Sequence, residues 1–506
     1  MLATSSPSDR LTDVPASRPA RFGRVDLLVV AAACGLSLAA TLPRLTRRPV
    51  WTDEGLTVGA TTQLFDTLRG TGGTMALYYA VITPIAQLST DRFWIRLPSA
   101  LFVAATVAVT YLVARRIGGR WLAATSSLVL ASTWALARWG IEARGYGLAM
   151  LLVAVGWLGV VELGATDDPR RRRRGWVLLA VGGLLGPLAH GLAALQLVAQ
   201  AAVLVARADR RRFVRPLLVL GLAWAVLLLV LFAYGAGEVA SWIEPPTWSD
   251  LKQVYAMLVG RGGLGVAVGA VVVAGTAIAA IRVVRGAPWR AGSTDVGADG
   301  WLPLVALAWA WGQPLAVLAI SLVRPYQEPR YLVSSLPGVA LLLGLAVTSL
   351  RGRPLRLGAT AVLMAVLLSM QPAVTNTSGE DWPSVVAVLD AQAQPGDGLV
   401  MRPLLRAPFD YAVAERGGTV ALEPVSPEVP IGEPHRIYGE PDGSLRQVLL
   451  DADERTVWVV VRGLESRDEV EALRDDPELA GERQIAQIQK LRGELAVYRF
   501  RLKERA

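Results

Sequence analysis

The sequence predicts an all-α polytopic membrane protein with about eleven transmembrane helices, followed by a C-terminal α/β domain outside the membrane. Three observations lead to this fold class. Hydrophobic residues make up 53% of the 506 residues and charged residues only 18%, and the mean hydropathy of +0.41 is too high for an ordinary globular protein. Apolar runs of membrane-spanning length recur between residues 25 and 374. After residue 376 these runs end and the charge density rises.

The net charge of +9 is unevenly distributed along the chain. Residues 377–506 hold 16 basic and 24 acidic residues, which leaves 35 basic and 18 acidic residues in 1–376. The basic excess therefore lies among the apolar runs, where arginines orient loops toward the cytoplasm. This distribution argues against a nucleic-acid partner and for membrane lipids as the surroundings of the basic residues.

Residues 1–25 are rich in Ser, Pro and Arg without apolar periodicity, which predicts a disordered cytoplasmic tail. The first apolar run, Val25–Thr41, follows a long basic segment, as in an uncleaved signal anchor. Its Cys34 is the only cysteine of the chain, so no intramolecular disulfide or cysteine metal cluster is expected. With only His190 and His435 as histidines, a histidine-built zinc site is not expected either.

Arginine clusters predict the topology, because a cluster beside a membrane span favours the cytoplasmic side. The six clusters are Arg10–Arg24, Arg115 to Arg120, Arg170–Arg174, Arg207–Arg215, Arg282–Arg290 and Arg351–Arg356. If all six are cytoplasmic, an even number of spans separates each from the next. Eleven spans satisfy this condition and place the N-terminus inside and the C-terminus outside a plasma membrane. They are 25–43, 97–115, 121–138, 146–165, 176–189, 191–207, 215–235, 263–284, 301–323, 331–350 and 357–374.

The predicted transmembrane domain, 26–376, has a long external first loop at 44–96. This loop contains an apolar stretch, Met75–Leu88, that is too short for a span of about 20 residues. Counting the stretch as a crossing would also place Arg170–Arg174 outside. We therefore expect a re-entrant or juxtamembrane helix on the outer side.

Residues 377–506 are predicted to form an extracytoplasmic α/β domain, because short β-type runs alternate with helical patterns. The β-type runs are Gly398–Met401, Thr419–Leu422, Thr456–Val461 and Leu495–Phe500, and the helical patterns include Trp382–Ala391 and Arg467–Asp475.

On this topology the outer face collects ionisable groups from distant parts of the chain. They are Asp53 and Glu54 after the first span, Glu142 and Arg144 in the second outer turn, His190 between the fifth and sixth spans, and Arg324 and Arg330 after the ninth. Each has a structural alternative: solvated loop carboxylates, an interfacial ion pair, a histidine at a helix hinge, or arginines that extend to lipid headgroups. Taken together, carboxylates beside arginines fit chemistry that needs a general base and a stabiliser for an anionic leaving group such as a lipid phosphate.

These residues also carry a resemblance to a family. The Asp53-Glu54 pair, Leu77-Tyr78-Tyr79, the segment Glu142-Ala143-Arg144-Gly145-Tyr146, and Arg330-Tyr331-Leu332 with Pro337 resemble the GT-C superfamily of integral-membrane glycosyltransferases. The similarity is to the bacterial branch of protein O-mannosyltransferases and the lipid A aminoarabinose transferase, and Asp381-Trp382 also matches that branch. Relatives often have two prolines before the Leu-Tyr-Tyr, whereas this chain has Thr74-Met75-Ala76 at that place.

The resemblance implies a glycosyltransferase that takes a monosaccharide from a polyprenyl phosphate and inverts the anomeric carbon. Asp53 would be the general base, and Arg144, Arg330 and Arg324 would hold the departing phosphate. Glu54 and Glu142 would orient those groups or an acceptor hydroxyl, and Tyr79, Tyr331 and His190 would line the pocket. The Ala-, Arg-, Gly- and Leu-rich usage is typical of a high-GC bacterium, for which mannose or arabinose is the expected sugar.

A lipid, a glycan and a protein all remain open as acceptors. No cofactor is expected: two adjacent carboxylates can bind Mg²⁺ or Mn²⁺, but a lipid monophosphate donor lacks the diphosphate that usually requires the metal. Two other functions stay open. A secondary transporter or lipid flippase fits the spans, although transporters place ionisable residues near the bilayer midplane. A membrane-anchored scaffold fits the acidic outer domain, which within an enzyme would act as an acceptor guide or lid.

Overall fold

The computed structural model describes most of the chain. The described residues are 22–71, 73–165, 168–207, 209–233, 243–286, 298–372, 374, 380–417, 420–433, 443–490 and 494–502. Of the predicted N-terminal tail, residues 1–21 lie outside the described part.

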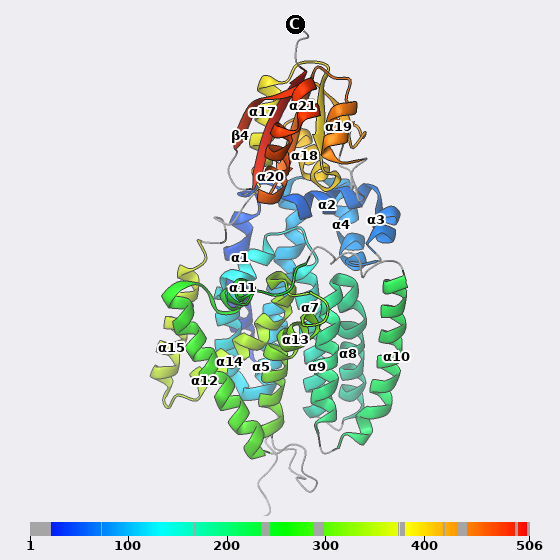
Figure 1. The fold of residues 1–506 in the computed structure, drawn as a ribbon. Coiled ribbons are helices and arrows are strands. Elements are labelled where there is room, and N and C mark those ends of the chain that lie inside the picture. The colour runs from blue at the N-terminus through cyan, green and yellow to red at the C-terminus, as the bar shows by residue number, and fades with distance from the viewer. Residues whose placement is uncertain are drawn as a thin grey trace, which may run out of the picture.

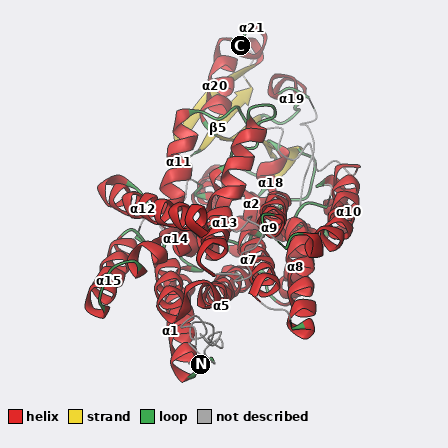
Figure 2. Ribbon diagram, turned by 90° about the horizontal axis from the view of Figure 1, so that it is seen from below, coloured by secondary structure: helices red, strands yellow, loops and turns green. Residues whose placement is uncertain are grey.

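Long apolar helices form one bundle in the lower part of the molecule (Figures 1 and 2). Its centre is α7, which packs against α5, α8 and α9, while α10 at the edge leaves most of its apolar surface exposed. The bundle consists of α1 (Arg24–Thr41), α5 (Arg92–Ser132), α7 (Tyr146–Ala165), α8 (Pro169–Ala189), α9 (Ala194–Val205), α10 (Arg211–Ala233), α12 (Gly262–Gly286), α13 (Ala298–Ser321), α14 (Leu336–Thr348) and α15 (Arg353–Ser369).

Seven helices in the described residues are long and apolar enough to cross a membrane, so the chain is a multi-pass membrane protein. The predicted number of eleven is not confirmed. Two predicted spans, 97–115 and 121–138, fall on the two halves of α5, which are separate helical segments joined by a kink at Gly118 and Gly119. The second predicted span also continues past Ser132 into the next short helix. The other differences concern helices that are short or charged: α9 has 12 residues, α15 has 17, and α8 begins with five arginines.

Residues 44–96, which were predicted to form an external loop, fold into a layer of short helices above the bundle (Figure 1). These are α2 (Thr52–Thr62), α3 (Leu64–Gly70) and α4 (Ala76–Leu88). The predicted short helix at Met75–Leu88 thus exists as α4. Met75, which precedes it, has a φ of 65°, an uncommon left-handed conformation for a residue with a side chain. Helix α4 forms even though no proline pair precedes its Leu-Tyr-Tyr sequence.

Further short elements join the bundle helices. They are η2 (Leu42–Arg44), α6 (Trp134–Gly140), η3 (Gly191–Ala193), α11 (Trp248–Val259) and η5 (Pro329–Ser335), of which η2 directly extends α1. The α6–α7 and α8–η3 connections carry the candidate site residues Arg144 and His190, and η5 carries Arg330.

The C-terminal residues form a five-stranded sheet at the top of the molecule (Figure 1). The strands are β1 (Asp397–Met401), β2 (Leu422–Ser426), β3 (Thr456–Arg462), β4 (Arg483–Lys490) and β5 (Leu495–Leu502), in the order β2-β1-β3-β5-β4. Strand β1 runs parallel to β2 and β3, and β5 runs antiparallel to β3 and β4. The helices are α17 (Trp382–Gln392), α18 (Pro403–Glu415), α19 (Leu445–Asp451), α20 (Leu464–Ala472, continued by η6, Leu473–Asp475) and α21 (Pro477–Glu482).

Helices cover both faces of this sheet, which explains why β1 and β3 are rich in apolar residues and buried along nearly their whole length. On β3, Trp458 and Val460 join the apolar cluster with α17 and α18, while Val457 and Val459 join the cluster with α19 and α20. Successive side chains of a strand point to opposite faces, so each face has its own core.

Two sequence expectations for this part need correction. The run Thr419–Leu422 was expected to be a strand, but β2 begins only at Leu422. Strand β4 was not expected at all, because its sequence RQIAQIQK is mostly polar and lacks the β-branched and aromatic residues that indicate strands.

Helix α2 connects the sheet domain to the membrane part. A Cβ atom added to Gly55 of α2 would lie 2.6 Å from the backbone of Pro408 in α18, so the two helices touch backbone to backbone. Nearby, the hydroxyl of Tyr411 donates to the carbonyl oxygen of Thr90 at 2.8 Å, and Arg92 pairs with Glu415 at 2.5 Å. The C-terminal domain is therefore packed directly on the helix that carries Asp53.

Candidate active site

The first turn of α2 contains two acidic residues, Asp53 and Glu54, with different partners. The helix starts after Trp51, which has an extended backbone and whose carbonyl oxygen accepts from the amides of Glu54 and Gly55. Acidic residues in a first helical turn are favourable because this end carries a partial positive charge. Asp53 and Glu54 occupy that turn, but they point to different surroundings.

Asp53 lies between two arginines from distant parts of the chain. Its Oδ2 is 3.7 Å from Nη2 of Arg144 and 3.4 Å from Nη1 of Arg330. Arg144 also donates to the backbone oxygen of Asp53 at 3.2 Å. The three side chains are 14–21% exposed, so the cluster is partly buried and still open to a ligand.

A close backbone approach holds Arg144 in this position. Arg144 lies in the α6–α7 connection, where its own amide donates to the carbonyl oxygen of Glu142 at 2.8 Å. A Cβ atom on the next residue, Gly145, would lie 2.3 Å from the carbonyl oxygen of Ala189, at the end of α8. The connection can therefore lie against α8 only because residue 145 has no side chain.

Arg330 lies at the start of η5 and is oriented by rings and carboxylates. Its guanidinium is 5.7 Å from the ring centre of Trp51, and its Nε is 3.5 Å from the carboxylate of Glu328. Burial raises the pKa of Glu328, and the negative charge of Asp53 acts in the same direction, against the opposing effect of Arg330. Glu328 is thus a second carboxylate of the cluster, with a higher pKa than an ordinary glutamate.

Glu54 is fully buried in a bidentate ion pair with Arg96 of α5, and Arg96 uses all five of its donors. Two of them go to Glu54, at 2.8 and 2.6 Å. The other bonds go to the carbonyl oxygens of residues 45, 48 and 49. Burial alone would raise the pKa of Glu54, but Arg96 and the amide of Ala143 hold it below its usual range. Glu54 therefore ties α2 to α5 and to the loop of Arg144.

Glu142 is also buried and lies in a separate arginine cluster. Its carboxylate contacts Arg138 of α6 and lies 3.6 Å from Nη1 of Arg48. Within the described part of the chain, its Oε2 has no hydrogen-bond partner. The Glu142 carboxylate thus pairs with Arg138 and Arg48, whereas Asp53 pairs with Arg144 and Arg330.

The predicted pocket-lining residues surround the two arginines. The ring of His190 lies 5.5 Å from that of Tyr146 and 4.7 Å from that of Tyr331. Burial and the nearby charges of Arg144 and Arg330 lower the pKa of His190 to about 3, so its imidazole is neutral at physiological pH. Tyr79 of α4 is buried, and its hydroxyl lies 4.0 Å from the sulfur of Met75.

Arg324 has a different environment from Arg144 and Arg330. It is exposed, with its guanidinium 5.6 Å from the ring centre of Tyr326. Its predicted contact with a donor phosphate stays a prediction.

The structure thus brings Asp53, Arg144, Arg330, Tyr331 and His190 into one neighbourhood. It adds four residues that sequence reasoning did not select: Arg48, Trp51, Arg96 and Glu328. Only Glu328 had a signal, its place in the charged segment before Arg330. Arg96 immediately precedes a predicted span, where an arginine is common for reasons of topology. Among the described residues, no group of three or more His, Cys, Asp or Glu side chains is placed to hold a metal ion.

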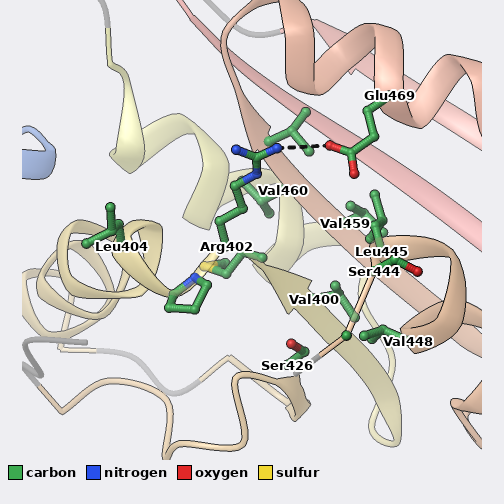
Figure 3. A pocket seen from close by; sticks show the side chains of 14 residues that line it. Val400, Arg402, Leu404, Ser426, Ser444, Leu445, Val448, Val459, Val460 and Glu469 are labelled. Atoms are coloured by element: carbon green, nitrogen blue, oxygen red, sulfur yellow. Dashed lines mark hydrogen bonds and ion pairs between the residues drawn. The ribbon is translucent and has the colours of Figure 1, made fainter. Parts of the chain in front are cut away.

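Two pockets lie outside this cluster. One, of about 730 Å³, opens in the C-terminal domain at the carboxyl ends of β1 and β3 (Figure 3). Its valine-rich wall includes Val400 and Val459, and Arg402 pairs with Glu469 across it at 3.0 Å. The other, of about 530 Å³, is almost wholly apolar and lies between the end of α4 and the start of α5. Neither pocket is lined by Asp53, Arg144 or Arg330.

Comparison with known proteins shows what fold surrounds the site. The sequence matches no protein-family model and no curated protein. The structure is similar to ArnT from Cupriavidus metallidurans in the apo state, with a TM-score of 0.58 and 14% identity over 94% of this chain and 97% of that one. It is also similar to the same protein bound to undecaprenyl phosphate, with a TM-score of 0.56 and 15% identity over 95% and 98%.

A third similar structure is the oligosaccharyltransferase of Archaeoglobus fulgidus tethered to an acceptor peptide. Its TM-score is 0.50, at 11% identity over 87% of this chain and 69% of that one. ArnT and this enzyme both have the GT-C fold. The fold expected from the sequence resemblance is therefore confirmed in its main features, and the similarity to ArnT covers 94% of this chain.

Proposed function

We propose that the chain is a membrane glycosyltransferase that moves a monosaccharide from a polyprenyl phosphate to an acceptor on the outer face of the plasma membrane. One observation carries this proposal: Asp53, at the start of α2, lies between Arg144 and Arg330 in a partly open cluster. A carboxylate that can accept a proton stands beside two guanidiniums that can hold a phosphate. The similarity to the structure of ArnT bound to undecaprenyl phosphate supports the choice of donor.

The proposed reaction is a single inverting displacement. The acceptor hydroxyl oxygen attacks the anomeric carbon and forms the new glycosidic bond, while its proton passes to a carboxylate oxygen of Asp53. The bond between the anomeric carbon and the phosphate oxygen breaks, and its electron pair leaves with the polyprenyl phosphate. Arg144 and Arg330 would stabilise the negative charge that grows on that phosphate.

The resting ion pairs indicate how donor binding activates the base. Asp53 forms ion pairs with the two arginines that would bind the phosphate. A phosphate that accepts bidentate hydrogen bonds from Arg144 or Arg330 would displace the Asp53 carboxylate from that arginine. The carboxylate of Asp53 would then turn to the acceptor hydroxyl. Arg324 would contact the phosphate only if its side chain moves away from Tyr326. Glu54 and Glu142 would act indirectly, by holding α2 and the loop that carries Arg144.

The apolar pocket between α4 and α5 offers a place for the polyprenyl chain. It is lined by Leu88, Trp94, Leu97 and Leu101, among others. Tyr79 and Ile85 are six residues apart on α4, about 9 Å along the helix axis. We propose that a chain whose phosphate binds at Arg144 runs along α4 to this pocket.

The sugar is proposed to be of the mannose or arabinose type, and a lipid, a glycan or a protein would serve as acceptor. The transfer is expected to need no metal. A transporter or flippase remains the alternative, because a bundle of apolar helices fits that function as well.

The decisive experiment measures transfer of labelled sugar from a panel of polyprenyl-phosphate donors in membranes. Asp53→Asn keeps the size of the side chain but removes the base. We expect it to lower turnover by about 10²–10⁴-fold while the protein still inserts. The same assay with EDTA tests the expected independence of metal.

Equal turnover of Asp53→Asn and wild type at matched expression would show that Asp53 is not the base. Absence of transfer from every donor, with both proteins folded, would favour the transporter, and a lipid-translocation assay would follow. Restoration of EDTA-treated activity by added Mn²⁺ would contradict metal independence.

A further inference from the structure

Glu380 links the C-terminal domain to the residue next to Asp53. Its carboxylate is buried, with 4% of the residue exposed. Oε2 accepts from the backbone amide of Thr52 at 2.7 Å and from the hydroxyl of the same residue at 2.7 Å. The indole of Trp382 donates to the same oxygen at 2.7 Å, and Nε of Arg462 lies 3.1 Å from Oε1. Oε2 therefore accepts hydrogen bonds from α2 and from Trp382, while Oε1 lies in an ion pair with Arg462 at the end of β3 but accepts no hydrogen bond within the described residues.

The bond to Thr52 fills a role that α2 cannot fill for itself. The first amides of a helix have no acceptor within the helix, and a side chain at the preceding residue usually supplies one. In α2 that residue is Trp51, whose side chain makes no such bond. Glu380, 328 residues away in sequence, supplies an acceptor for one of these first amides, that of Thr52. Its negative charge also lies at the positive end of the helix.

Three contacts then fix the first turn of α2 around Asp53. Thr52 is held by Glu380, Glu54 by Arg96, and Gly55 by the backbone of Pro408. Two of these three anchors belong to the C-terminal domain. Asp53 is the residue of this turn that is left facing Arg144 and Arg330.

We propose that Glu380 is a positioning residue for Asp53, so that the C-terminal domain is a structural part of the candidate active site. Asp381 and Trp382, the motif at the start of this domain, support the same role. Asp381 begins α17 by accepting from the amide and hydroxyl of Ser384, and the Trp382 indole holds the carboxylate of Glu380. This inference rests on the proposed function for its catalytic consequence, but the geometry of α2 can be tested without it.

The test uses the full-length protein and changes both sides of the contact. Glu380→Ala removes the acceptor, and Thr52→Val removes only the hydroxyl on the α2 side. Glu415→Gln is the matched control, because Glu415 joins the same domain to Arg92 of α5 without touching α2. We measure kcat, the donor KM, the thermal midpoint, and amide hydrogen exchange of the peptide that covers residues 50–60.

Glu380→Ala is expected to speed exchange at the start of α2 and to lower kcat by about 10–100-fold, the effect of a small displacement of a reacting group. The donor KM should change little, since Arg144 and Arg330 are carried by other elements. Thr52→Val should lower kcat in the same direction by a smaller factor. Glu415→Gln should leave kcat and the exchange of this peptide as in wild type. If Glu380→Ala does not fold, Thr52→Val decides the question by the same two readouts.

Wild-type kcat and unchanged exchange in Thr52→Val and Glu380→Ala would overturn the proposal. So would a loss of kcat in Glu415→Gln equal to that in Glu380→Ala, since any weakening of the domain contact would then suffice. A wild type without sugar transfer would defeat the proposed function instead. In that case the exchange measurement alone decides whether Glu380 holds α2.

Discussion

The arginines of the candidate site differ in what surrounds them. Arg330 is enclosed by the ring of Trp51, the carboxylate of Glu328 and Asp53. Arg324, six residues earlier, is exposed and lies over Tyr326. A guanidinium presents a planar fork that matches two phosphate oxygens, whereas a lysine presents a point charge. Charge alone therefore does not determine which arginine binds the donor.

We predict that Arg330→Lys raises the donor KM by about 10–100-fold, because it loses the second hydrogen bond to the phosphate and the stacking on Trp51. The measurement is sugar transfer as a function of donor concentration. Arg324→Lys is the paired variant and should change the KM far less. Equal effects of the two substitutions would show that Arg324 also binds the phosphate, as the resemblance implies.

At the scale of elements, the site depends on a connection that lies unusually close to a helix end. The α6–α7 connection carries Arg144 and contacts the end of α8 at Gly145. Because the opposing atom is the backbone oxygen of Ala189, no side-chain rotation can make room for a methyl group there. Interiors are packed too densely to absorb such a shift without moving neighbours.

We predict that Gly145→Ala lowers turnover by about tenfold or more, since displacement of the connection moves Arg144 away from Asp53. Gly191→Ala is the control, because Gly191 lies in the neighbouring turn and an added Cβ atom would meet nothing within 4 Å. Transfer rates and thermal midpoints of both variants are compared. If Gly145→Ala loses stability but retains full turnover among the folded molecules, the close contact does not position Arg144.

The same elements show what the sequence can and cannot predict. The membrane helices and most strands follow from apolar runs and their periodicity. Asp53, Arg144 and Arg330 could be grouped because residue type and predicted topology place all three on the outer face. The pairing of Glu54 with Arg96, and of Thr52 with Glu380, could not be predicted. These contacts join residues 42 and 328 positions apart and depend on how α2 packs between α5 and the sheet domain.

An exposed cluster of arginines and the candidate site lie at opposite ends of the molecule. The exposed arginines at the start of α8 lie at one end of the bundle, and the sheet domain with the Asp53 layer lies at the other (Figure 1). Basic clusters favour the cytoplasmic side. The candidate site and the C-terminal domain should therefore face outward, where a lipid-linked donor would meet acceptors of the cell envelope.

Single-cysteine labelling tests this orientation. Cys34 is the only cysteine and lies half-buried in α1, with its thiol donating to the carbonyl oxygen of Ala104, so Cys34→Ala provides a cysteine-free background. Into it we introduce Glu423→Cys on the exposed side of β2 or Arg172→Cys in the exposed arginine run of α8. A membrane-impermeant maleimide should label the first variant in intact cells and the second only after permeabilisation. The reverse pattern would place Asp53 in the cytoplasm, where a donor presented at the outer face could not reach it.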